Sequence, residues 1–186
     1  MDLAWYARKA QEVAPDLVGC TLVRRIDGVD YRGLIVETEA YSYGDPACHG
    51  YAGKTDRNAA IFGVPGSVYV YLIYGMYHCV NIVTEAEDVC SAVLLRALEL
   101  DRIPTWVSQT EKPSRIAAGP GKICRALKID RSLNDIKLER DCPLWIEPRN
   151  PNFSETLHQT TRIGITKGAE IPWRWYLKGH PSVSKL

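Results

Sequence analysis

Apolar residues near the start of the chain change from helical to alternating spacing. In residues 3–18 they recur three and four positions apart, which predicts a helix that ends at Gly19. Residues 20–26 and 31–40 then have the composition of two strands, and Asp27-Gly28 between them forms a good turn. The pattern therefore predicts a helix followed by an antiparallel hairpin.

The rest of the chain predicts more strands than helices. The further strands are expected at residues 67–73, 78–84, 92–98, 144–146, 161–165 and 173–177. One helix is expected within residues 113–127, beginning near Gly119-Pro120. Because no internal linker interrupts this pattern, we predict one domain, residues 1–186, of the α+β class. Its core would be a curved, largely antiparallel β-sheet flanked by helices.

Residues 66–77 contain four tyrosines within nine positions. A strand would place Tyr69 and Tyr71 on one face. Tyr74 falls out of that alternation, beside Gly75, which permits a tight bend. A hairpin whose tyrosines are simply half-buried core residues would have the same composition. Polar segments on both sides of this run favour a functional role.

Length and charge limit the possible functions without selecting one. A chain of 186 residues can bury a proper core, and its net charge of +1 excludes a general polycation. Residues 112–140 hold eight basic and three acidic side chains, whereas residues 27–45 are mainly acidic. A basic face of this kind suits a polyanion, but it also suits an ordinary solvated surface. The long polar loop of residues 41–60 is typical of a functional or a disordered segment.

Six cysteines are scattered without a C-x-x-C pair, as expected for reduced thiols in a reducing compartment. Neighbouring residues in a strand point to opposite faces, so neither Cys48-His49 nor His78-Cys79 is a natural chelate, and we expect no metal and no cofactor. The N-terminus has no secretory pattern, and no apolar stretch is long enough to cross a bilayer. We therefore expect a soluble, cytoplasmic protein without membrane contacts.

Two carboxylates follow each other on the strand that leads into the polar loop. Glu37 and Glu39 are two residues apart, so both can emerge on one face, either as a general base or as solvated edge charges. Asn81 and Arg96 are embedded in apolar segments and must find polar partners. Either glutamate would serve Arg96, and the pair would be structural unless it faces a cavity.

The chain resembles the alkyladenine (3-methyladenine) DNA glycosylase family in five motifs, which occur in the family's order. They are RGLIVETEAY at 32–41, DRN at 56–58, PGSVYVYLIYGMYHCVNI at 65–82, VLLRALE at 93–99 and GPGKICRAL at 119–127. The resemblance covers about residues 17–182. It implies a monofunctional enzyme that flips alkylated or deaminated purines, such as 3-methyladenine and hypoxanthine, out of double-stranded DNA. The enzyme would then hydrolyse the N-glycosidic bond and leave an abasic site.

The resemblance also implies roles for individual residues in catalysis and base binding. Glu39 would be the general base that activates water, and Arg96 would hold that water and the carboxylate in place. The flipped base would stack between Tyr41 and Tyr71, with His49 on the opposite side offering a hydrogen bond. Such stacking should favour positively charged alkylpurines.

Four further residues would act on specificity and on the DNA around the lesion. Asn81 resembles the family's gatekeeper against the exocyclic amine of guanine. Tyr74 resembles the wedge that fills the gap in the duplex. Arg57 and Lys122 are candidates for contacts with the DNA backbone. We expect the protein to act as a monomer.

Two other functions stay open at this point. A binding module on the same fold could recognise damaged DNA without cutting it, although Glu39 and Arg96 would then serve no purpose. An enzyme acting on free nucleosides would not need Tyr74. The chain departs from the family at residues 100–118, which are shorter, and at His78, where an apolar aromatic is more usual.

Overall fold

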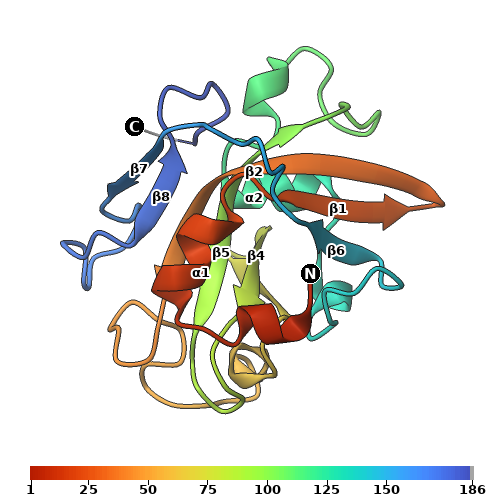
Figure 1. Cartoon of the computed structure of the whole chain (residues 1–186). Helices are drawn as coiled ribbons and strands as arrows, with labels where there is room; N and C mark the ends of the chain where they lie inside the picture. The colour runs from red at the N-terminus through yellow and green to blue at the C-terminus, as the bar shows by residue number, and fades with distance from the viewer. Residues whose placement is uncertain (185–186) are drawn as a thin grey trace.

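The computed structural model describes residues 1–184, and most of its elements belong to one eight-stranded sheet (Figure 1). Its strands are β1 (Thr21–Ile26), β2 (Val29–Tyr41), β3 (Val68–Ile73), β4 (Tyr77–Val83), β5 (Ala92–Leu100), β6 (Leu144–Glu147), β7 (Leu157–Thr160) and β8 (Arg174–Leu177). Their order is β3-β4-β5-β2-β1-β6, with β8 paired to β2 and β7, and every pair is antiparallel. The predicted α+β class with a curved antiparallel sheet is confirmed.

Two α-helices and four short 3-10 turns accompany the sheet within residues 1–184. They are α1 (Ala10–Leu17), α2 (Pro120–Ala126), η1 (Leu3–Tyr6), η2 (Ala59–Phe62), η3 (Pro113–Arg115) and η4 (Arg131–Leu133). The first helix, α1, packs against β2, β5 and β8, while α2 packs against β4 and β5 (Figure 1). No helix in this part of the chain is both long and apolar enough to span a lipid bilayer.

The helix predicted over residues 3–18 is interrupted. Asp2 caps η1 by accepting a hydrogen bond from the N–H of Ala4, and the backbone becomes extended at Lys9 before α1 begins. This break lets the ring of Tyr6 enter the main core, where it is fully buried. The helix predicted near Gly119-Pro120 is confirmed as α2, with proline in its first turn.

The strand β2 connects the parts of the sheet. Along one edge it pairs with β5 over residues 33–41. Along the other edge it pairs first with β1, over residues 29–34, and then with β8, over residues 37–39. Because β2 has neighbours on both edges where it carries Glu37 and Glu39, the backbone at these carboxylates is fixed.

The register between β2 and β5 shifts on both sides of Glu37. The first shift adds a residue to β2, and the second adds Arg96 to β5, so that Arg96 has no Cα partner in β2. Bulges of this kind bend a strand and re-aim its side chains, and they are common beside functional sites. Here the side chain of Arg96 lies within ion-pair distance of both Glu37 and Glu39.

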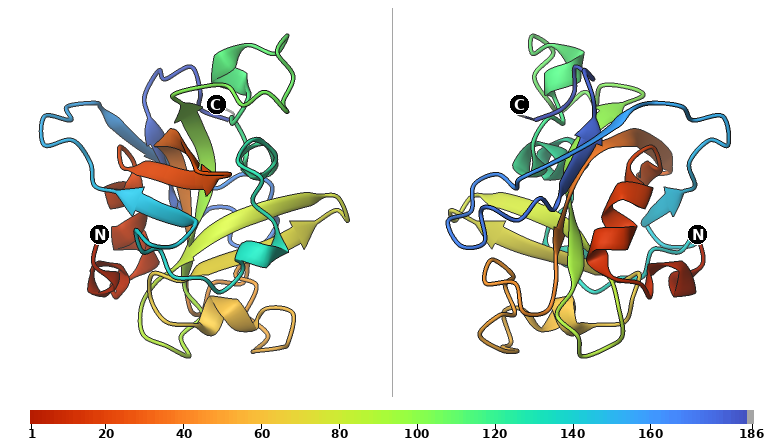
Figure 2. Two further views of the ribbon diagram at one scale, coloured as in Figure 1. Left: turned by 90° about the vertical axis from the view of Figure 1, so that its right-hand side faces the viewer. Right: turned by 60° about the vertical axis from the view of Figure 1, so that its left-hand side comes forward.

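The hairpin of β3 and β4 extends away from the body of the protein (Figure 2). Its turn has positive φ at Tyr74 (53°) and Gly75 (69°), and the N–H of Met76 donates to the carbonyl of Ile73 at 3.2 Å. Two positive φ angles are the signature of a type I′ hairpin turn. The predicted bend is therefore confirmed, and it leaves the side chain of Tyr74 80% exposed.

The strand predicted over residues 161–165 is wrong. The strand β7 ends at Thr160, and the chain then forms a loop in which Gly164 has a φ of 76°. The N–H of Ile163 donates to a carboxylate oxygen of Glu39 instead of to a neighbouring strand. A tertiary hydrogen bond thus takes the place of the ladder bond that the apolar pattern predicted.

Candidate active site

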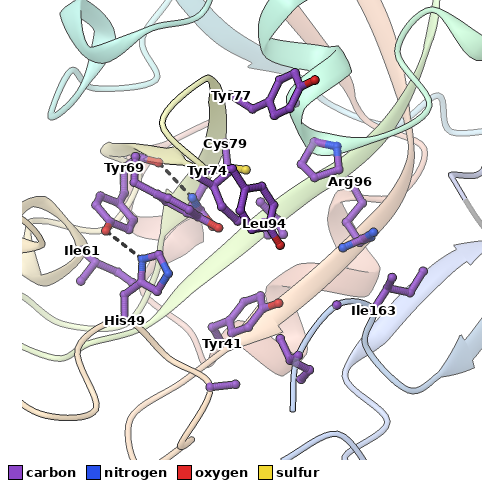
Figure 3. Close-up of a pocket in the computed structure, with 18 residues that line it drawn as sticks. Tyr41, His49, Ile61, Tyr69, Tyr74, Tyr77, Cys79, Leu94, Arg96 and Ile163 are labelled. Atoms are coloured by element: carbon purple, nitrogen blue, oxygen red, sulfur yellow. Dashed lines mark hydrogen bonds between the residues drawn. The ribbon is translucent and has the colours of Figure 1, made fainter. Parts of the chain in front are cut away.

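A cavity of about 380 Å³ opens between the β3–β4 hairpin, the loop of residues 41–60 and the segment 163–165 (Figure 3). This volume is in the range of pockets that bind small ligands. Its lining is mostly aromatic and aliphatic. Six of the nine residues predicted for the site line it: Tyr41, His49, Tyr71, Tyr74, Asn81 and Arg96. The other three, Glu39, Arg57 and Lys122, lie outside the lining.

One wall of the cavity is built from β3, β4 and the loop. Tyr69 and Tyr71 share a face of β3, as predicted, with ring centroids 5.5 Å apart. The side-chain amide of Asn81 on β4 donates to the carbonyl of Tyr69 at 3.1 Å (Figure 3). His49 lies 3.0 Å from the hydroxyl of Tyr69 through Nδ1, and its ring makes an edge contact with Tyr71 at 4.2 Å. His49 is therefore on the Tyr71 side of the cavity.

Burial controls the protonation states of Tyr69, Tyr71 and His49 in this wall. It raises the pKa of Tyr69 to about 12 and that of Tyr71 further, so both phenols are neutral near pH 7. Burial lowers the pKa of His49, and the positive charge of Arg57 lowers it more. His49 is accordingly neutral near pH 7, with one ring nitrogen donating and one accepting. Since Nδ1 contacts Tyr69, Nε2 is the nitrogen that remains for a ligand.

Glu39 lies directly behind the cavity wall, and its side chain is fully buried. Its Oε2 accepts a hydrogen bond from the hydroxyl of Tyr41 at 2.7 Å. Its Oε1 accepts one from the N–H of Ile163 at 2.7 Å and lies 3.2 Å from Nη1 of Arg96. Tyr41, Ile163 and Arg96 all line the cavity. Within residues 1–184 these contacts use three of the four acceptor sites that a carboxylate offers.

Glu37 is the second carboxylate that pairs with Arg96. Its Oε1 lies 3.3 Å from Nε of Arg96 and 2.7 Å from Nε of Arg174, and its Oε2 accepts the N–H of Ser184 at 2.7 Å. Burial would lower the pKa of Arg96, but the carboxylates of Glu39 and Glu37 outweigh it and raise that pKa. Both glutamates are fully buried, so they are not solvated edge charges.

Arg162 is a site residue that the sequence did not indicate. Its side chain is fully buried, pairs with Asp45 through both terminal nitrogens and donates to the carbonyl of Ala40 at 2.9 Å. Its guanidinium lies 4.7 Å from the ring centroid of Tyr41, a cation–π contact. Arg162 thus fixes one face of Tyr41 from behind. The only signal of this role in the sequence was that an arginine stands in a segment predicted as a strand.

Lys122 and Arg57, the two predicted contacts with the DNA backbone, differ in their ionic surroundings. Lys122 forms an ion pair with Glu111 and donates to the carbonyl of Arg115 at 3.0 Å, so part of the basic surface of residues 112–140 is already neutralised. Arg57 is exposed on the 41–60 loop, and its charge acts on His49. Of the two predicted DNA-backbone contacts, Arg57 is the one whose charge reaches the cavity wall.

Both a protein-family model and individual known proteins match nearly the whole chain. The family model described as methylpurine-DNA glycosylase matches residues 4–181. A protein of Trichodesmium erythraeum is 54% identical, over 97% of this chain and 95% of its own length. Proteins of a Synechococcus species (54% identical, over 97% and 96%) and of Methanoculleus marisnigri (49% identical, over 98% and 97%) are also similar. Each of the three is named as a proposed 3-methyladenine DNA glycosylase.

The buried pair of Asp45 and Arg162 yields a prediction about stability. Replacing Asp45 with Asn leaves Arg162 as an uncompensated buried cation, which should lower the free energy of unfolding by about 3–5 kcal/mol. The same change at Asp88, whose pair with Lys54 is exposed, should have little effect. Urea denaturation of the three proteins measures the difference. Equal stabilities of the two variants would contradict the structural role of this pair.

Proposed function

Because the chain belongs to the methylpurine-DNA glycosylase family, we propose that it removes alkylated or deaminated purines, such as 3-methyladenine and hypoxanthine, from double-stranded DNA. One observation carries this proposal: an aromatic cavity adjoins a buried carboxylate that an arginine holds in place. The cavity suits a flat base, and the carboxylate suits the activation of water. The products would be the free base and an abasic site.

The flipped base would stack between Tyr41 and Tyr71. Arg162 occupies one face of the Tyr41 ring, which leaves the other face for a base. Stacking on an aromatic side chain is worth about 1–3 kcal/mol per base, and a positively charged alkylpurine would gain a cation–π contribution as well. Nε2 of His49 would form a hydrogen bond with an edge of the base.

Hydrolysis would begin with a water molecule at the acceptor site of Glu39 that no described residue uses. The water oxygen would form a bond to C1′ of the deoxyribose while Glu39 takes up its proton. The C1′–N bond would break, and its electron pair would leave with the purine. Arg96, which is also paired with Glu37, would keep the carboxylate of Glu39 oriented during this step. No step requires a lysine or a metal, and the DNA strand stays uncut.

Access to a base in a duplex requires that the base leaves the stack, and the gap must be filled. Tyr74 suits this task because it is exposed at the tip of the hairpin and also borders the cavity. Apolar wedges between base steps are a known means of kinking DNA. Arg57, exposed on the 41–60 loop, would contact one phosphate. Lys122 would contact another while it remains near Glu111, so that its charge is shared between Glu111 and the DNA.

Replacing Glu39 with Gln distinguishes an enzyme from a protein that only binds damaged DNA. Loss of the general base should reduce the release of 3-methyladenine from duplex DNA by at least about 100-fold. Affinity for the damaged duplex should stay within a few-fold, because no proposed DNA contact is removed. Single-turnover excision and a binding titration measure both quantities, and the exposed Glu99→Gln variant serves as control. A large loss of binding would mean that Glu39 is structural.

Replacing Tyr74 with Ala tests the wedge. Excision from duplex DNA should fall markedly, while excision of the same lesion from single-stranded DNA should change little, since no stack has to be opened there. Tyr43 has the same exposure, 80%, but does not line the cavity, so Tyr43→Ala is a matched control. An equal loss on both forms of DNA would refute the wedge and would favour an enzyme of free nucleosides.

Replacing Asn81 with Ser tests the gatekeeper. Asn81 is almost fully buried where it lines the cavity, so a shorter side chain should make room for the exocyclic amine of guanine. We expect the ratio of kcat/KM for 7-methylguanine to that for 3-methyladenine to rise several-fold. Thermal unfolding of the variant checks that loss of the hydrogen bond to Tyr69 has not damaged the wall. An unchanged ratio would remove this role from Asn81.

A further inference from the structure

Two cysteines that are distant in the sequence meet beneath the 41–60 loop. Cys48 belongs to that loop, whereas Cys90 lies shortly before β5. Their sulfur atoms are 2.8 Å apart, both thiols are free, and both side chains are buried. They belong to the second apolar cluster of the protein, which also contains Ile61, Phe62 and Tyr69. No group of three potential metal ligands occurs within residues 1–184, so the two thiols are not part of a larger ligand set.

The pair is reached from a second, smaller cavity of about 140 Å³, separate from the candidate active site. Cys48 and Cys90 both line it, and the exposed rings of Tyr43 and Tyr51 stand at its edge. Most of the other cysteines are buried, and none of them lines this cavity. A small reagent can therefore approach this pair of thiols without unfolding the main core.

The contact between the two sulfurs shifts the pKa values of the two thiols in opposite directions. The short contact with the sulfur of Cys48 lowers the pKa of Cys90, burial opposes this shift, and the N–H of Gly50 lowers the pKa of both thiols. The same contact raises the pKa of Cys48. Gly50 packs so closely that a Cβ at this position would overlap the sulfur of Cys90. Any larger residue at position 50 would therefore displace the side chain of Cys90 from its present place.

We propose that Cys48 and Cys90 are an oxidation site that forms an intramolecular disulfide by exchange with a low-molecular-weight disulfide. The thiolate of Cys90 attacks one sulfur of the small disulfide, whose S–S bond breaks and releases a thiolate. The thiol of Cys48 then loses its proton and attacks the sulfur of Cys90, which releases the second thiolate. The protein loses two hydrogens, and the small disulfide is reduced to two thiols.

This bond would form with little movement of the chain. A disulfide has an S–S distance of about 2.05 Å, so the two sulfurs need to approach by less than about 1 Å. The new link would join positions that are 42 residues apart, which restricts the unfolded chain. Because His49 directly follows Cys48, the disulfide would also fasten the loop that carries His49 in its present position.

The test uses the reduced, full-length protein and bis(hydroxyethyl) disulfide as the oxidant. Remaining thiols are alkylated after treatment, and the digested protein is mapped by mass spectrometry. We expect two of the six thiols to disappear, a peptide cross-linked through Cys48 and Cys90, and a rise in Tm on the order of 5–10 °C that dithiothreitol reverses. Cys48→Ser and Cys90→Ser should abolish the rise, whereas Cys142→Ser, at a less buried cysteine, should keep it.

Three results would overturn the proposal: no loss of thiols in the native protein, a cross-link between other cysteines, or a stable adduct of the small thiol at Cys90. The peptide map of the wild type decides between these results even where a serine variant fails to fold. The readouts do not depend on glycosylase activity, so this inference and the proposed function can fail separately. The excision rate of the oxidised protein should stay within about two-fold of the reduced one, since the active-site cavity is lined by neither sulfur.

Discussion

Within residues 1–184, three acidic side chains are buried completely, and each requires a cation in the interior. The acids are Glu37, Glu39 and Asp45, and their partners are Arg96, Arg162 and Arg174. Buried ion pairs of this kind add little net stability, because desolvation of the charges offsets their attraction. What they fix is geometry: they join β2 to β5, to β8 and to the loops that begin at residues 42 and 161. The other residues of the candidate site are arranged around these ion pairs.

The charged cluster also explains how an apolar cavity can adjoin a reactive carboxylate. Of the charged residues in this cluster, Arg96 alone lines the cavity, and its carboxylate partners lie behind the lining, so the rest of the wall can be made of aromatic and aliphatic side chains. Tyr41 belongs both to the cavity wall and to the surroundings of the charged cluster, because its hydroxyl contacts Glu39 and its ring face contacts Arg162. A base bound against Tyr41 would therefore be coupled directly to the position of the carboxylate. The β3–β4 hairpin, by contrast, borders the cavity without joining the charged cluster.

Alternation and turn chemistry were sufficient to predict β1 to β5 and the bend at Tyr74, because these features depend on neighbouring residues. The rule that a buried charge needs a partner was sufficient to predict that Arg96 meets Glu37 or Glu39. What the sequence could not reveal depends on contacts between distant segments. The N–H of Ile163, in the segment that was predicted as a strand, donates to the carboxylate of Glu39, 124 positions away in the sequence. Cys48 and Cys90, which meet under the loop, are 42 positions apart. No local pattern records such a partner.

The tip of the hairpin illustrates a conflict between folding and activity. Tyr74 has a left-handed backbone conformation that costs a residue with a Cβ about 1–2 kcal/mol and that glycine or asparagine adopts more easily. Its ring is exposed, so burial does not compensate for this strain. A search for more stable sequences would replace this tyrosine early. Thermostability alone is thus a misleading guide to engineering this protein, because the most easily improved position of the turn is the one proposed to enter the DNA.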